Sequence, residues 1–260
     1  MPIREVIDRR LTRVIWIGNG FSDMEWTRTA LVTGAGRGIG EAVAKRLSDR
    51  YAVAVNDIDR EPAEETVSDI REQGGTAISV VGDVSSGDTA DRITESTLDE
   101  FGRIDALVNN AGIETVHSFV DLPESDWNKV MDTNLKAQYL LSQRVADQMV
   151  DNSIEGAIVN ISSIHDSIPR QNKIHYDTSK AGVLMLTKDM ALELAEHGIN
   201  VNCVAPGLVA TDMNNVMESE ERTERAEERI PWGRVGKPED VASVVDFLLS
   251  DKAEYLTGAR

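Results

Sequence analysis

Residues 33–40 read Thr-Gly-Ala-Gly-Arg-Gly-Ile-Gly, and this stretch decides the fold class. It lies between an apolar run expected to be a strand, residues 29–33, and an amphipathic segment expected to be a helix, residues 39–50. Glycines at such a junction permit a tight turn and let backbone N–H groups approach a pyrophosphate at the start of the helix. The spacing is T-G-x-x-x-G-x-G rather than G-x-G-x-x-G, and in this context it predicts a nucleotide-binding loop.

Outward from this loop, short β-branched runs alternate with segments of helical spacing. The expected strands are 29–33, 52–57, 77–81, 106–109, 157–161 and 201–204, and the expected helices are 39–50, 61–73, 87–101, 124–150 and 176–197. Strands separated by helices of this length imply crossovers that cover both faces of a parallel sheet. We therefore expect an α/β protein with a three-layer Rossmann fold and a doubly wound parallel sheet, formed by one domain over residues 28–260.

The N-terminal segment, residues 1–27, stands apart from this pattern as a basic and irregular extension. Met24 lies just before the first expected strand, where a compact domain naturally begins. Our hypothesis is that Met24 is the biological start, and a disordered arm is the alternative.

Composition excludes several classes of protein. The 260 residues are 41% apolar and carry a formal charge of −18, so we expect a globular core and no nucleic-acid partner. No apolar run approaches a membrane span. The single cysteine, Cys203, excludes a disulfide framework and favours the cytoplasm, and no spacing predicts a metal site. Only eight of the 27 basic residues are lysines, which suggests a halophilic source or simply an acidic enzyme.

Asp57 ends the second expected strand and bears on the choice of nucleotide. A carboxylate there can accept hydrogen bonds from the ribose hydroxyls and repel a 2′-phosphate, which favours NAD over NADP. Arg37 in the glycine loop complicates the choice, because a guanidinium can hold a 2′-phosphate. Asp59, rather than Asp57, is expected to cap the following helix.

Tyr176 and Lys180 are four residues apart at the start of a long expected helix, and therefore lie on one face. A phenol is a poor base at neutral pH unless its pKa is lowered, and a nearby ammonium is one means of lowering it. Ser163 follows the strand 157–161, at the carboxyl edge where open α/β sheets build their sites.

These residues carry a family resemblance. Seven landmarks recur in the order found in classical short-chain dehydrogenases/reductases: Thr33–Gly40, Asn109-Asn110-Ala111-Gly112, Asn134, Ser163, Tyr176, Lys180 and Pro206-Gly207. The resemblance covers residues 28–260. It implies that Tyr176 moves the proton, Ser163 holds the substrate oxygen, and Asn134 orders a water for the proton relay. Lys180 would bind the nicotinamide ribose and lower the tyrosine pKa.

The same resemblance implies the cofactor contacts. They would come from the glycine loop, the ends of the strands and the segment after the last of them: Thr33, Gly34, Arg37, Gly38, Ile39, Gly40, Asp57, Asp83, Val84, Asn110, Gly112, Tyr176, Lys180, Pro206, Gly207, Val209 and Thr211. Asp83 and Val84 would flank the adenine. Val209 and Thr211 would hold the nicotinamide amide.

Within the family, several stretches are similar to bacterial glucose 1-dehydrogenases, which makes a sugar or polyol the leading substrate class. Glu114 and His165 would then be the polar substrate groups, although Asp166-Ser167 and Arg170–Ile174 depart from that pattern. One alternative is a 3-oxoacyl carrier-protein reductase, whose docking surface is usually basic. An alternative of another class is a non-catalytic nucleotide sensor.

The remaining expectations concern single residues, the segment 218–228 and the end of the chain. His117 and His197 are expected at the surface, and Cys203 in the core. The segment 218–228 is expected to be a charge-dense helix, either solvated or a lid over the substrate. The chain stops where the family continues into a final strand, so one sheet edge is expected to stay open or to be filled by the N-terminal extension. A homo-oligomer, tetramer or dimer, is expected from the family.

Overall fold

A computed structural model describes residues 28–211, 213 and 220–260 of the chain. Its centre is a parallel sheet of six strands in the order β3-β2-β1-β4-β5-β6. The strands are β1 Thr29–Val32, β2 Ala52–Val55, β3 Ala77–Ser79, β4 Ala106–Asn109, β5 Ala157–Ile161 and β6 Asn200–Val204. The chain order reverses between β1 and β4, which places a switch point at the carboxyl ends of these two strands.

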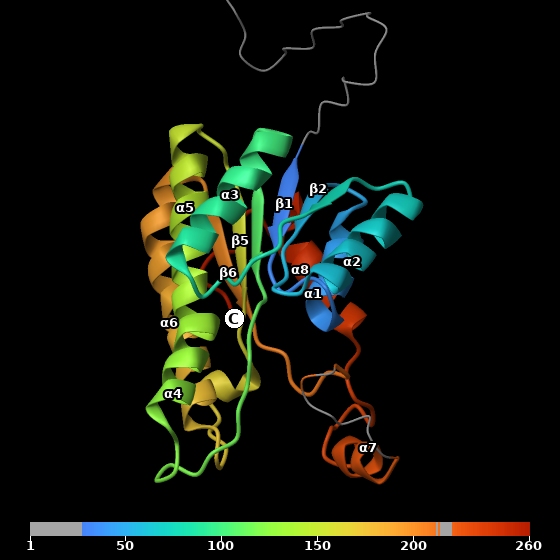
Figure 1. Cartoon of the computed structure of the whole chain (residues 1–260), viewed down its shortest axis with the longest axis vertical. Helices are drawn as coiled ribbons and strands as arrows, with labels where there is room; N and C mark the ends of the chain where they lie inside the picture. The colour runs from blue at the N-terminus through green and yellow to red at the C-terminus, as the bar shows by residue number, and fades with distance from the viewer. Residues whose placement is uncertain (1–27, 212, 214–219) are drawn as a thin grey trace, which may run out of the picture.

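Helices cover both faces of the sheet (Figure 1). Their bounds are α1 Gly38–Leu47, α2 Arg60–Glu72, α3 Gly87–Phe101, α4 Glu124–Met131, α5 Ala137–Asp151, α6 Ile174–Leu194, α7 Glu220–Glu227 and α8 Pro238–Leu248. Helices α1, α2 and α8 lie on one face, and α3, α5 and α6 on the other. The expected three-layer Rossmann fold is confirmed.

The strands bury both faces because successive side chains point in opposite directions. Val32 and Val108 join the core beneath α1, α2 and α8, whereas Leu31 and Leu107 join the core beneath α3, α5 and α6. All four are fully buried. This double burial explains why the strands read as continuous apolar runs rather than as alternating ones.

The segment expected as one helix over 124–150 has a different structure. Helix α4 ends at Met131, a π-helical turn covers Asp132–Lys136, and α5 begins at Ala137. Turns of this kind are rare and occur mostly at functional sites. Asn134 lies at the middle of this turn. Helix α8, with a proline at its start, is an element that the sequence reading did not include.

The outer edge of β6 is partly covered by the last residues of the chain. The backbone N–H of Gly258 donates to Val201 O at 2.7 Å, and the N–H of Cys203 donates to Ala259 O at 2.9 Å. Asn202 adds side-chain bonds to Leu256 O and from Ala259 N. The expectation that this edge stays open or is filled by the N-terminal extension is therefore wrong for these positions of β6.

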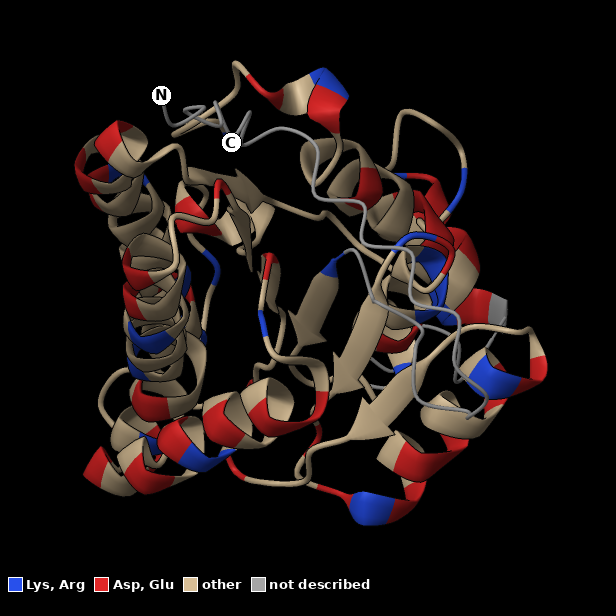
Figure 2. Ribbon diagram, turned by 90° about the horizontal axis from the view of Figure 1, so that it is seen from above, with Lys and Arg blue, Asp and Glu red and all other residues tan. Residues whose placement is uncertain are grey.

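Two further expectations concern the N-terminal extension and the lack of a membrane span. The irregular extension 1–27, including the candidate start at Met24, lies outside the described residues. Within the described residues, no helix has the length and apolarity needed to cross a membrane. Figure 2 shows aspartate and glutamate spread over the outer helices, as the net charge of −18 requires.

Candidate active site

The glycine loop joins β1 to α1 and is shaped for close approach by a ligand. Gly34 and Gly38 have positive φ angles of 59° and 58°, which side-chain-bearing residues rarely adopt. A Cβ on Gly40 would lie 2.1 Å from the carbonyl oxygen of Gly34, so a side chain cannot be accommodated there. The residues present therefore fit a dinucleotide, whose pyrophosphate would lie against the N-terminus of α1, beside Arg37 and Ile39.

Asp57 is held at this loop by the backbone. Its carboxylate accepts the N–H of Gly36 at 2.9 Å and the N–H of Asp59 at 3.1 Å, and the residue is 6% exposed. Asp59 does occupy the cap position of α2, but its side chain makes no capping bond and instead forms an ion pair with Arg37. Asp59 is therefore the N-cap residue as expected but without a side-chain capping bond, and Arg37 already has a carboxylate partner.

The segment after β4 is fastened to the same loop. The side-chain amide of Asn110 donates to Thr33 O and Gly34 O, and the Thr33 hydroxyl accepts the backbone N–H groups of Asn110 and Ala111. Asn110 therefore links the ends of β1 and β4, and its side-chain N–H groups are used in hydrogen bonds within the protein. After β3, Val84 is buried and Asp83 accepts the N–H of Ser85.

Asn134 is fully buried and its side chain is also committed to protein. Its amide donates to Ile113 O at 3.0 Å and to Ser179 Oγ at 3.1 Å, and its oxygen accepts the N–H of Ile113 at 2.8 Å. Gly112 lies beside it, since a Cβ on that glycine would be 3.3 Å from the Asn134 oxygen. Both side-chain N–H groups of Asn134 are therefore used in hydrogen bonds within the protein.

Ser163, Tyr176 and Lys180 come together at the carboxyl end of β5. The Lys180 ammonium donates to Ile161 O at 2.8 Å and lies 5.6 Å from the centre of the Tyr176 ring. The Ser163 hydroxyl accepts the N–H of His165 and interacts with the Tyr176 phenol. The helix begins two residues before Tyr176, at Ile174, so the tyrosine lies in its first turn.

Burial dominates the acidity of these groups in the chain alone. Burial and the negative charge of Glu114 raise the pKa of Tyr176 to about 12, against smaller opposing effects of Ser163 and Arg170. Burial lowers the pKa of Lys180 to about 8. The expected depression of the tyrosine pKa by Lys180 is therefore absent in the chain by itself.

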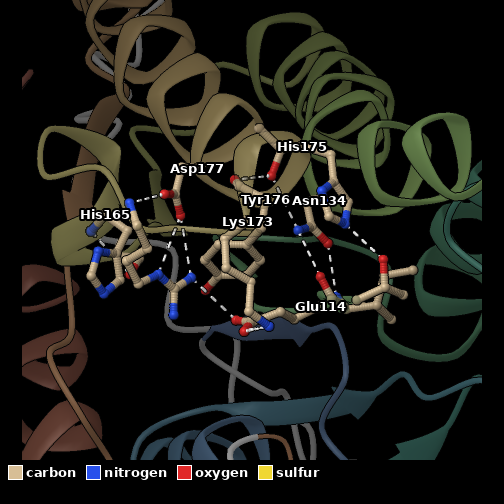
Figure 3. A network of polar contacts seen from close by, with 12 residues as sticks. Glu114, Asn134, His165, Lys173, His175, Tyr176 and Asp177 are labelled. Carbon is tan, nitrogen blue, oxygen red and sulfur yellow. Dashed lines mark hydrogen bonds and ion pairs between the residues drawn. The ribbon is translucent and has the colours of Figure 1, made fainter. Parts of the chain in front are cut away.

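A cluster of four charged residues linked by ion pairs, which we call the tyrosine clamp, lies beside Tyr176: Glu114, Arg170, Lys173 and Asp177. Figure 3 shows Glu114, Lys173 and Asp177 near the tyrosine. Arg170 contacts Glu114 at 3.3 Å and Asp177 at 3.2 Å, and Lys173 also pairs with Glu114. The Arg170 guanidinium lies 5.0 Å from the centre of the Tyr176 ring, within cation–π range. The sequence reading noted that 170–174 departs from its relatives but did not find these pairs.

Two histidines lie behind the clamp. His175 is fully buried, and its Nε2 lies 2.6 Å from the Thr115 hydroxyl. His117 pairs with Asp126 at 2.6 Å and its ring lies 6.2 Å from that of His175. His117 is thus half-buried rather than a surface residue as expected. His197 ends a helical turn before Gly198 and is exposed, as expected.

Two hollows flank this centre. One, of about 510 Å³, is lined by His117, His165, Arg170 and Asp177 on the clamp side. The other, of about 970 Å³, begins at Ile164, Pro206 and Gly207 and extends beneath α7 to Trp232. Within the described residues no cluster of side chains could hold a metal ion.

The segment after β6 completes the cofactor side. Pro206 O accepts the N–H of Ile164, which ties this segment to the residue after Ser163. Val209 bridges to Gly236 in a short parallel contact. A Cβ on Gly38 would lie 3.2 Å from the Thr211 methyl, so Thr211 borders the glycine loop.

The fold and this arrangement agree with comparisons to known proteins. Residues 34–260 match the family model described as enoyl-(acyl carrier protein) reductase. The chain belongs to the short-chain dehydrogenase/reductase family and is an oxidoreductase acting on CH–OH groups with NAD(P).

Individual relatives differ in substrate. The chain is 39% identical to glucose 1-dehydrogenase 2 of Bacillus subtilis over 89% of this chain and 91% of the relative. It is 40% identical to a 3-oxoacyl-(acyl-carrier-protein) reductase of Staphylococcus aureus over 90% of this chain and 96% of the relative. A solved structure described as a putative gluconate dehydrogenase from Agrobacterium tumefaciens aligns with a TM-score of 0.85 at 35% identity, covering 90% and 93% of the two chains.

Proposed function

We propose that the chain interconverts a secondary alcohol and a ketone, or a sugar hemiacetal and a lactone, with a preference for NAD over NADP. The bound nicotinamide supplies or accepts the hydride. Tyr176 exchanges the hydroxyl proton, Ser163 holds the substrate oxygen, and Lys180 binds the ribose. The observation that carries the proposal is the meeting of Tyr176, Ser163 and Lys180 at the strand ends beside the glycine loop.

The NAD preference rests on Asp57. Its buried carboxylate lies at the glycine loop and would repel a 2′-phosphate. Arg37, the group that would favour that phosphate, is already paired with Asp59. A tenfold or greater preference for NADP would overturn this part of the proposal.

We propose a sugar or polyol as the leading substrate class. His165 lines the hollow on the clamp side, where it would offer a hydrogen-bonding group to a hydroxyl-rich substrate, and a glucose 1-dehydrogenase is among the relatives. Glu114, the other polar group expected at the substrate, is paired with Lys173. The test is a panel of sugars, polyols, secondary alcohols and 3-oxoacyl thioesters with each cofactor, followed by absorbance at 340 nm. The proposal fails if no alcohol or ketone is turned over.

A second candidate function is the reduction of 3-oxoacyl thioesters. The long hollow beneath α7 is bordered by apolar side chains such as Leu208, Ile230 and Trp232, which suits an acyl group. The same panel separates the two, because a thioester reductase would leave sugars untouched. We place the enzyme in the cytoplasm as a homo-oligomer, which gel filtration with light scattering tests; the halophilic hypothesis is tested by stability against salt.

A further inference from the structure

Helix α7 carries its positive charges on one side and its negative charges on the other. Arg222 and Arg225 lie three residues apart on one side of α7, and Arg229 follows four residues later, in the turn after the helix ends at Glu227. These three residues and Ala226 line the hollow of about 970 Å³, whereas the described glutamates Glu221, Glu224 and Glu227 do not. We call this surface, Arg222, Arg225 and Arg229, the arginine face.

Two members of the arginine face, Arg225 and Arg229, are open to a ligand. Arg225 pairs with Glu221 at 2.7 Å, but both side chains are about three-quarters exposed, so the pair is weak and screened. No described residue pairs with the guanidinium of Arg229. Arg234 adds a fourth guanidinium at the edge of the hollow, where it is held by Asp240 at 2.7 Å.

The hollow connects this face to the reacting centre. Its inner end is formed by Ile164, which follows Ser163, and by Pro206, whose carbonyl accepts the Ile164 N–H. Between the two ends lie Leu208, Ala226 and Ile230. A substrate with its reacting carbon near Ser163 can therefore extend along an apolar surface to the arginines.

We propose that the substrate carries an anionic group, a carboxylate or a phosphate, remote from its reacting carbon, and that the arginine face binds it. Guanidinium groups can donate two parallel hydrogen bonds to the oxygens of either anion. A concentration of arginines along one hollow is notable in a chain with a net charge of −18. This inference rests on the proposed oxidoreductase activity and names the charge class of its substrate.

The experiment compares an anionic compound with a neutral one in each of two chemical classes. One pair is gluconate and glucose, and the other is acetoacetyl-coenzyme A and a neutral acetoacetyl thioester of N-acetylcysteamine. The variant is R225Q/R229Q, and R60Q is the control, since Arg60 is an exposed arginine on α2. We expect the parent to favour the anionic member of one pair, which also identifies whether the anion is a carboxylate or a phosphate.

The expected result is a rise of about tenfold or more in KM for the anionic member in R225Q/R229Q, with kcat and the neutral member unchanged. Raising the salt concentration should have the same effect on the parent. Equal effects on both members of a pair would overturn the proposal. So would a weaker NAD affinity in the variant, because the arginines would then serve the cofactor phosphates.

A binding measurement separates this inference from the proposed function. Calorimetry of gluconate and of coenzyme A with the NAD-loaded parent and variant requires no turnover. Binding of one of them to the parent, weakened in R225Q/R229Q but not in R60Q, supports the arginine face even if no tested substrate reacts. Absence of binding by both probes, or equal binding by parent and variant, overturns the inference.

Discussion

The two sides of the cleft differ in how their charges are partnered. On the tyrosine clamp every charge is neutralised by another residue of the protein: Glu114 by Arg170 and Lys173, and Arg170 also by Asp177. On the arginine face the partner of Arg225 is exposed, and no described residue pairs with the guanidinium of Arg229. A partnered, half-buried charge is costly to redirect to a ligand, whereas an open guanidinium is not. The clamp therefore suits positioning of Tyr176, and the arginine face suits recognition.

The largest expected effect on activity comes from replacing Tyr176, which lies between these two sides. Tyr176→Phe removes the proton-transferring hydroxyl and leaves the ring, its packing against Arg170 and the glycine loop in place. We expect kcat to fall by about 10²–10⁴-fold with little change in NAD affinity. Steady-state kinetics and NAD binding measured by fluorescence check this. Near-parental turnover would contradict the assigned role.

The next effect concerns a negative charge at the cofactor end, opposite in sign to the arginine face. Asp57→Ala removes the carboxylate that accepts the Gly36 N–H and would repel a 2′-phosphate. We expect the ratio of kcat/KM for NAD to that for NADP to fall by about tenfold or more. Asp99→Ala, at an exposed position of α3, is the control. An unchanged ratio would show that Asp57 serves only the loop.

Two residues of the tyrosine clamp, Glu114 and Arg170, should shift the pKa of Tyr176 in opposite directions. Glu114 raises the Tyr176 pKa and Arg170 lowers it. Alcohol oxidation requires the phenolate, so kcat rises with pH through this pKa. Glu114→Gln should move the midpoint to lower pH and Arg170→Gln to higher pH, each by about half to one unit.

The pH profile of kcat checks this pair of variants. Glu95→Gln, an exposed carboxylate of α3, should leave the midpoint unchanged. A shift in the same direction for both clamp variants would indicate a structural disturbance rather than an electrostatic one.

A smaller effect, on stability, is expected from the buried ion pair between Asp166 and Arg260. The Asp166 side chain is fully buried and is held by Arg260 at 2.7 Å. Arg260→Gln leaves that carboxylate without its cation, which we expect to cost about 1–3 kcal/mol of unfolding free energy. Thermal unfolding should therefore begin several degrees lower, whereas R60Q, which breaks an exposed pair, should be neutral. Equal melting temperatures for both variants would contradict this contrast between buried and exposed pairs.

The fold was predictable because its signals are local. The glycine loop, the β-branched runs and the helical spacing each depend on a few neighbouring residues. The strands therefore begin and end within two residues of their expected bounds. The π-helical turn at 132–136 was not predictable, since Asn134 adopts it through bonds to Ile113 and Ser179, which come from two other segments. The covering of β6 by residues 258–259 likewise depends on long-range contacts.

At the site, the sequence pattern indicated the residues but not their pairing. Glu114 was expected as a free polar group, whereas Arg170 and Lys173 neutralise it from a loop more than fifty residues away. The arginine face differs, because the spacing of its arginines over residues 222–229 was visible in the sequence. The segment 218–228 was interpreted by its excess of glutamate, and sorting its charges by helix face would have found the arginines.

The contrast between the two sides is tested most directly by removing one arginine from each. The measurement is kcat/KM for the anionic member of the preferred substrate pair divided by that for the neutral member, in the parent, Arg229→Gln and Arg170→Gln. We predict that Arg229→Gln lowers this ratio several-fold, and that Arg170→Gln leaves it unchanged while moving the pH profile. A ratio that falls in Arg170→Gln and not in Arg229→Gln would contradict the assignment of recognition to α7 and of tuning to the tyrosine clamp.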